Sequence, residues 1–168
     1  MKRPADIFYF VLLFLLQLVI SDYVHLGPWI CLNLIPLLIL LIPLSYRPHA
    51  VLLIAFGLGL GLDLLSDGVP GLNAFAAVLA AAPRKFFYRT MVNADRQDKT
   101  EVPLMGEVGL VKYLKYLAVL TAIYLVAYVL VDCISFRPAG FIALKVIASW
   151  SASTALCLLL ALPLQSRN

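Results

Sequence analysis

Long apolar stretches separated by short polar connections dominate the chain. Judged against the roughly 17–25 residues that a membrane-crossing helix needs, they predict six transmembrane spans. These spans cover residues 5–20, 28–44, 50–65, 70–88, 109–131 and 139–164. The one long polar connection, residues 89–107, follows the fourth span. The pattern therefore predicts an all-α integral membrane protein in which residues 1–168 form a single domain, a bundle of six transmembrane helices.

Composition supports a membrane setting. The chain is 63% hydrophobic with a mean hydropathy of +0.97, whereas soluble domains are roughly 45–50% apolar. The apolar run after the basic start is long and lacks a small-residue cleavage site, so we expect the first segment to remain as an anchor.

Basic residues are distributed unequally between the two sides of this layout. One side carries Arg137 alone, with Lys145 inside the sixth span. The other side carries Lys2, Arg3, Arg47, Arg84, Lys85, Arg89, Arg96, Lys99, Lys112, Lys115 and Arg167. The positive-inside rule then places both termini in the cytoplasm and argues against a re-entrant fourth segment. Because the cations flank apolar spans and form no separate basic face, no nucleic-acid partner is expected.

A glycine-rich stretch, residues 57–76, contains an acid within an apolar helix. Gly59 and Asp63 share one helical face, and Gly57 and Gly61 lie on the opposite one. Glycine lets a neighbouring helix approach closely, so the third span is expected to be central. An ionisable residue inside a membrane helix is a functional-site hypothesis, and Asp63 is that residue here.

A tight turn from Ser66 to Gly71 follows, with Pro70 inside it. It is either a periplasm-facing contact or ligand loop, or simply the connector of a helical hairpin. Asn73, just inside the next span, is expected to cap that helix or to bond between helices.

Lys145 enters the sixth span from the same outer side as Asp63, at a depth of roughly 10 Å. Buried membrane charges tend to pair, so an Asp63–Lys145 ion pair is one expectation. Snorkelling of Lys145 alone to the surface is the other. Proton translocation is disfavoured, because no chain of titratable groups continues inward. Ser149 and Ser153 extend the stripe of Lys145 and favour tight helix packing over a substrate groove.

Cations and aromatic residues meet at the end of the fourth span, where Arg84 and Lys85 precede Phe86, Phe87 and Tyr88. Arg84 and Lys85 are expected to snorkel to the interface. The cluster is typical of an interfacial anchor, and a cytoplasmic docking site is the alternative.

No nucleophile–base pair, phosphate-binding glycine loop or metal-ligand cluster is visible, and the two histidines, His25 and His49, fall on opposite sides. The sequence therefore predicts neither an enzyme nor a bound cofactor.

The stretch from Gly57 to Ala76 resembles the MreD family of bacterial rod-shape-determining proteins. The matching residues are Gly61, Asp63, Leu64, Ser66, Pro70, Gly71, Leu72 and Ala74. The basic connector Tyr46-Arg47-Pro48 also resembles that family's, and length and predicted topology agree across the chain.

The resemblance implies a non-catalytic inner-membrane subunit of the cell-elongation machinery that binds the bitopic protein MreC and helps position peptidoglycan synthesis. Further partners it implies are an MreB-like filament, a RodA-like glycosyltransferase, the elongation transpeptidase and membrane lipid. The implied fold is similar to the substrate-binding subunits of energy-coupling-factor transporters. A vitamin-binding subunit of such a transporter is the alternative function, although the bulky first span lacks the Ala-x-x-x-Ala surface that those subunits use for docking.

Overall fold

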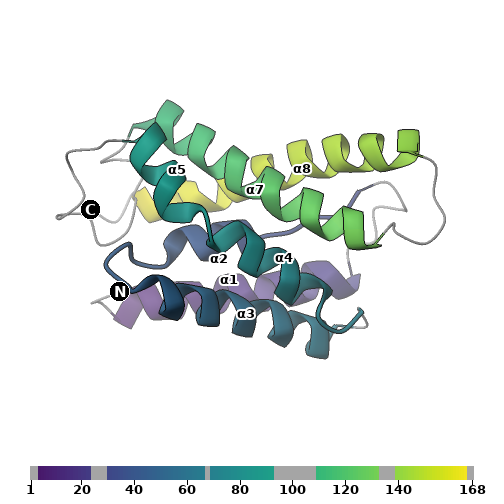
Figure 1. The fold of residues 1–168 in the computed structure, drawn as a ribbon. Coiled ribbons are helices and arrows are strands. Elements are labelled where there is room, and N and C mark those ends of the chain that lie inside the picture. The colour runs from purple at the N-terminus through teal and green to yellow at the C-terminus, as the bar shows by residue number, and fades with distance from the viewer. Residues whose placement is uncertain (1–3, 24–29, 67–68, 93–108, 133–138, 166–168) are drawn as a thin grey trace.

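The computed structural model describes residues 4–23, 30–66, 69–92, 109–132 and 139–165. Within these residues all regular structure is α-helical. The helices are α1 (Pro4–Tyr23), α2 (Ile35–Leu41), α3 (Pro48–Leu65), α4 (Leu72–Ala81), α5 (Arg84–Met91), α7 (Leu110–Asp132) and α8 (Ala139–Gln165) (Figure 1). Among the described residues, three helical stretches are long and apolar enough to cross a membrane: Pro48–Leu65, Leu110–Asp132 and Ile142–Leu162. The prediction of an all-α chain with apolar, membrane-type helices is confirmed.

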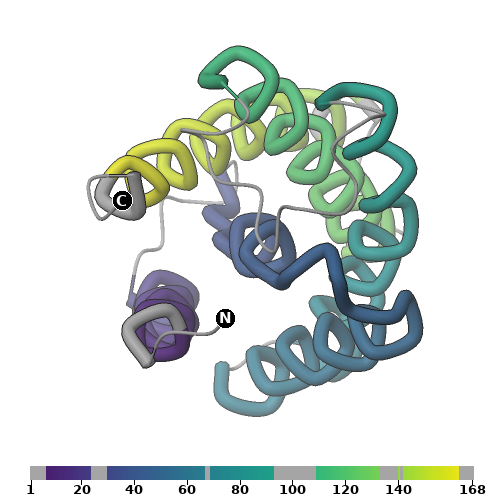
Figure 2. The backbone as a smooth tube through the Cα atoms, turned by 90° about the vertical axis from the view of Figure 1, so that its left-hand side faces the viewer, coloured from purple at the N-terminus to yellow at the C-terminus, as the bar shows by residue number. Residues whose placement is uncertain are grey.

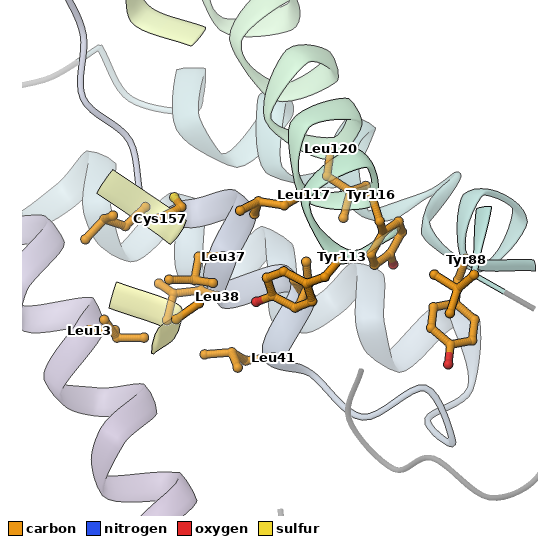
Figure 3. Close-up of a cluster of buried hydrophobic side chains, with 14 of the residues drawn as sticks. Leu13, Leu37, Leu38, Leu41, Tyr88, Tyr113, Tyr116, Leu117, Leu120 and Cys157 are labelled. Carbon is orange, nitrogen blue, oxygen red and sulfur yellow. The ribbon is translucent and has the colours of Figure 1, made fainter. Parts of the chain in front are cut away.

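The short helix α2 occupies the middle of the bundle, with α3, α4, α7 and α8 curving around it and α1 on the remaining side (Figure 2). All seven of its residues are buried. Leu37, Leu38 and Leu41 pack into a cluster with side chains of α1, α7 and α8 (Figure 3). Ile35 and Ile39 pack into a second cluster with α3, α4 and α7. A helix that is apolar all round is a core helix, so the expectation that the third span is central is wrong.

The second predicted span, residues 28–44, is not one helix. Its described part begins as a non-helical segment, residues 30–34, and continues as α2. Pro36 lies in the first turn of α2, where its missing amide proton is not needed. Ile42 precedes Pro43 and has extended backbone, with φ −65° and ψ 133°. A residue before proline avoids the helical region, and this ends α2.

The fourth predicted span, residues 70–88, is divided into α4 and α5. The break falls at Pro83, whose ring is incompatible with an uninterrupted helix. α5 then continues to Met91, into the predicted connection 89–107, of which residues 93 onward lie outside the described part. The first, third, fifth and sixth predicted spans correspond to α1, α3, α7 and α8.

The helices run back and forth along one common direction (Figure 1). α3 and α4 form an antiparallel hairpin, as do α7 and α8. The beginnings of α1, α3 and α7 and the ends of α5 and α8 therefore gather at the left-hand end of Figure 1.

Candidate functional site

Asp63 lies in the last turn of α3, and its side chain is buried, with 3% exposed. Its Oδ2 accepts hydrogen bonds from the amides of Gly71 and Ala74 at 2.9 and 3.1 Å. Its Oδ1 accepts from the amide and the Nδ2 of Asn73 at 3.1 and 2.9 Å. The first amides of a helix have no partner within it, and the positive end of the helix dipole favours an anion. Asp63 therefore caps α4 from the preceding helix.

The glycines of α3 differ in what surrounds them. A Cβ on Gly59 would lie 2.4 Å from the Cα of Ala74, so α4 approaches α3 there at backbone contact. A Cβ on Gly61 would lie 3.3 Å from the Phe14 ring of α1, closer than an ordinary van der Waals contact. A Cβ on Gly57 would meet nothing within 4 Å. The expected close approach of a neighbouring backbone is confirmed at Gly59. The neighbour of Gly61 is a side chain, and the expectation is wrong for Gly57.

The described residues of the turn between α3 and α4 make their hydrogen bonds within the hairpin that these two helices form. Gly71, the residue before α4, has φ +91°, in the left-handed region that favours glycine. Ser66 Oγ donates to the carbonyl of Leu62 at 2.9 Å, within α3. Pro70 is exposed, and residues 67–68 lie outside the described part. These contacts fit the connector interpretation of the turn.

A chain of buried polar side chains runs from this hairpin across the bundle. The Tyr124 hydroxyl of α7 donates to Asn73 Oδ1 and also lies 3.5 Å from Asn33 Oδ1. Gln17 of α1 donates to Asn33 Oδ1 at 3.3 Å and accepts from the amide of Leu34 at 2.6 Å. The expected bond between helices at Asn73 is confirmed. Gln17, Asn33 and Tyr124 were not predicted, although polar groups inside apolar spans are the signal that marks them.

The non-helical segment 30–34 is held by the serine stripe of α8. Ser149 and Ser153 accept hydrogen bonds from the amides of Cys31 and Asn33 at 2.9 and 3.1 Å. Backbone without helical hydrogen bonds is tolerated at membrane depth only where protein or water satisfies it. The two serines therefore accept hydrogen bonds from the backbone of segment 30–34, in addition to their expected role in close helix packing.

Lys145 pairs with a carboxylate other than the expected one. Its Nζ lies 2.7 Å from Oδ2 of Asp132, in the last turn of α7. Asp63 directs both of its oxygens to the start of α4 instead. Within the described part of the chain, Lys145 forms its ion pair with Asp132. The prediction of an Asp63–Lys145 pair is therefore wrong.

Arg84 is buried, with 1% exposed, and does not snorkel. Its guanidinium donates to the carbonyls of Leu40 and Ile42, at the end of α2. The last carbonyls of a helix lack partners and carry the negative end of its dipole, and α2 ends inside the protein. Lys85 does lie at the surface, where its Nζ donates to the carbonyl of Tyr46 at 2.9 Å. The snorkelling prediction is therefore wrong for Arg84.

Among the residues that the structure describes, no three His, Cys, Asp or Glu side chains lie close enough to hold a metal ion. The buried polar groups instead satisfy helix ends and non-helical backbone. The arrangement holds segments of the bundle in fixed positions.

No family model, curated protein or solved structure matches this chain. Its function is therefore inferred from the residues and their contacts.

Proposed function

We propose that this chain is a non-catalytic, multi-pass subunit of the bacterial inner membrane that works in cell elongation, as proteins of the MreD type do. The observation that carries the proposal is the hairpin formed by α3 and α4. Asp63, Gly59 and Gly71 have mechanical roles there: a helix cap, a backbone contact and a left-handed turn. The stretch that resembles the MreD family is thus a rigid scaffold, as a non-catalytic subunit requires.

The proposed topology has six passes, with both termini in the cytoplasm. Two of the passes are composite, one formed by the segment 30–34 with α2, the other by α4 with α5. The exposed cations Arg47, Arg89, Lys112 and Lys115 belong to the elements that meet at the left-hand end of Figure 1. The positive-inside rule assigns that end to the cytoplasm.

In this proposal, α1 contacts the transmembrane helix of an MreC-like partner. One side of α1, which includes Leu13 and Gln17, packs against the bundle. Its other sides expose large apolar residues, among them Phe8 at 70% and Leu15 at 52%. The partner in turn connects the subunit to an MreB-like filament, a RodA-like glycosyltransferase and the elongation transpeptidase.

Co-purification of the tagged chain in mild detergent, with unbiased identification of bound proteins, tests the proposal. We expect to recover an MreC-like protein and enzymes of cell-wall synthesis. Recovery of an ATPase with transporter subunits, or of a bound vitamin, would overturn the proposal in favour of an uptake system.

A pair of matched variants tests the α1 contact. Phe8→Ala with Leu15→Ala trims two outward side chains of α1, and Leu53→Ala with Leu64→Ala trims two outward side chains of α3. We expect both variants to accumulate normally and the α1 variant alone to lose the partner. Equal partner recovery from both would exclude α1 as the contact.

A further inference from the structure

Five cations lie on the short helix α5 or on the two elements tied to it. Arg47 precedes α3, Lys85 and Arg89 belong to α5, and Lys112 and Lys115 lie in the first two turns of α7. We refer to these five residues as the basic collar. The beginnings of α3 and α7 share the end of the bundle at which α5 terminates (Figure 1).

Two hydrogen bonds fix these elements to one another. The Lys85 Nζ donates to the carbonyl of Tyr46 at 2.9 Å, which brings α5 beside the neighbouring Arg47. The Lys112 Nζ donates to the carbonyl of Val92, directly after α5, at 3.2 Å. The cations of the collar are therefore held on one surface rather than scattered around the bundle.

The charge of the collar is not compensated by the described side chains. Its two tied ammonium groups bind neutral carbonyl oxygens. Every member except the half-buried Lys85 is exposed. Among the side chains that the structure describes, the ion pair is that of Lys145 with Asp132, in the last turn of α7, whereas the collar lies at its start. Among the described side chains, positive charge is therefore in excess around α5.

The length of chain that ends at the collar is compatible with a position at the lipid headgroups. The rise from Leu72 to Arg89 is at most about 26 Å at 1.5 Å per residue, close to the roughly 30 Å thickness of a bilayer's hydrocarbon core. Phe86 and Tyr46, exposed by 65% and 41%, lie among the cations. Aromatic side chains at this level are typical of the membrane–water interface.

We propose that the basic collar binds the phosphate headgroups of anionic phospholipids in the surrounding membrane. Arginine binds phosphate through two parallel N–H donors, and lysine stems carry their charge along the apolar surface to the headgroups. Each cation near an anionic surface strengthens association about fivefold. The proposal depends on the membrane setting of the chain and not on its part in cell elongation.

Titration of phosphatidylglycerol and phosphatidylcholine into the full-length chain in a neutral detergent, followed by native mass spectrometry, tests the proposal. The wild type should bind phosphatidylglycerol at least tenfold more tightly than phosphatidylcholine. The pair Arg89→Gln with Lys115→Gln leaves the contacts of Lys85 and Lys112 in place and should weaken phosphatidylglycerol binding about twenty-five-fold.

Asp22→Asn is the control, because Asp22 is exposed near the end of α1, away from the collar. This variant changes the net charge by one unit and should bind phosphatidylglycerol within twofold of the wild type. Equal binding of the two lipids by the wild type would overturn the proposal. So would wild-type phosphatidylglycerol affinity in the Arg89→Gln, Lys115→Gln variant, provided that it elutes as a folded, monodisperse protein.

Discussion

Two buried side chains of opposite charge, Asp63 and Arg84, each satisfy unpaired backbone groups at a helix terminus, one at a helix start and the other at a helix end. The side chain of Asp63, in α3, faces the beginning of α4 and accepts hydrogen bonds from three backbone amides and one side-chain amide. Arg84 lies beyond the end of α2 and donates to two backbone carbonyls. In each case the charge faces the end of the helix dipole that favours it.

The comparison shows how this chain accommodates charge in an apolar interior. A buried charge is costly unless hydrogen bonds compensate it. The two helices involved are short, with ten residues in α4 and seven in α2. The capped end of α2 is buried, whereas the exposed Pro70 lies just before the capped start of α4. The caps are not equally complete: all four bonds of Asp63 are made, whereas the Arg84 Nε has no partner among the described groups. Asp63 should therefore contribute more to stability.

The largest effect is expected from Asp63→Leu. It leaves the amides of Gly71, Asn73 and Ala74 without an acceptor, and hydrogen bonds to a charged group contribute about 1.5–3 kcal/mol each. We expect a loss of about 5 kcal/mol, comparable with the stability of a whole domain. Fluorescence-detected size exclusion should show little folded protein. Accumulation of this variant at the wild-type level would contradict the capping role.

Arg84→Met should have the second-largest effect. It removes the donor to two carbonyls at the end of α2 but leaves no uncompensated charge, so a loss of about 3 kcal/mol is expected. Arg84→Lys keeps the charge and one donor nitrogen, and it should lose less, because both bonds of Arg84 come from the single nitrogen Nη2. Thermal denaturation in detergent can rank the variants. If the Arg84→Met protein were less stable than the Asp63→Leu protein, the Arg84 cap would contribute more to stability than the Asp63 cap, contrary to the prediction.

The third prediction concerns the contact that brings Asp63 to α4. Gly59→Ala places a methyl group 2.4 Å from the Cα of Ala74, and such overpacking costs about 1–3 kcal/mol. Gly57→Ala adds the same group where nothing lies within 4 Å and should be neutral or slightly stabilising, because alanine is the better helix former. Equal melting temperatures for the two variants would show that the hairpin tolerates separation.

The sequence predicted the α3–α4 hairpin better than it predicted the centre of the bundle. Asp63, Gly59 and Asn73 stand out locally, as an acid, a small residue and an amide in apolar helices, and their partners lie within a few turns along the chain. The bounds of α3, α7 and α8 also follow closely from uninterrupted apolar runs.

The rest depends on contacts that hydrophobic periodicity does not report. From sequence alone, an apolar run containing Pro36 and Pro43 is indistinguishable from one bent span. The serines that accept hydrogen bonds from the amides of its non-helical part lie more than a hundred residues away along the chain. Arg84 occupies a position from which a side chain can equally snorkel to the surface or turn inward. Its inward direction is decided by the carbonyl end of α2, a distant segment.

The smallest predicted effect tests whether the two caps are energetically separate. Tyr124 donates to Asn73, the residue bound to Asp63, whereas Tyr116 donates to the backbone carbonyl of Arg84 at 3.3 Å. Each Tyr→Phe change should cost about 1 kcal/mol. Residues in one hydrogen-bond network are non-additive, and distant ones add within about 0.5 kcal/mol. Tyr124→Phe should therefore couple to Asp63→Asn by about 1 kcal/mol in a double-mutant cycle, and Tyr116→Phe should not. Equal coupling of both tyrosines would mean that α7 transmits strain between the caps, and the bundle would then respond to either charge as a unit.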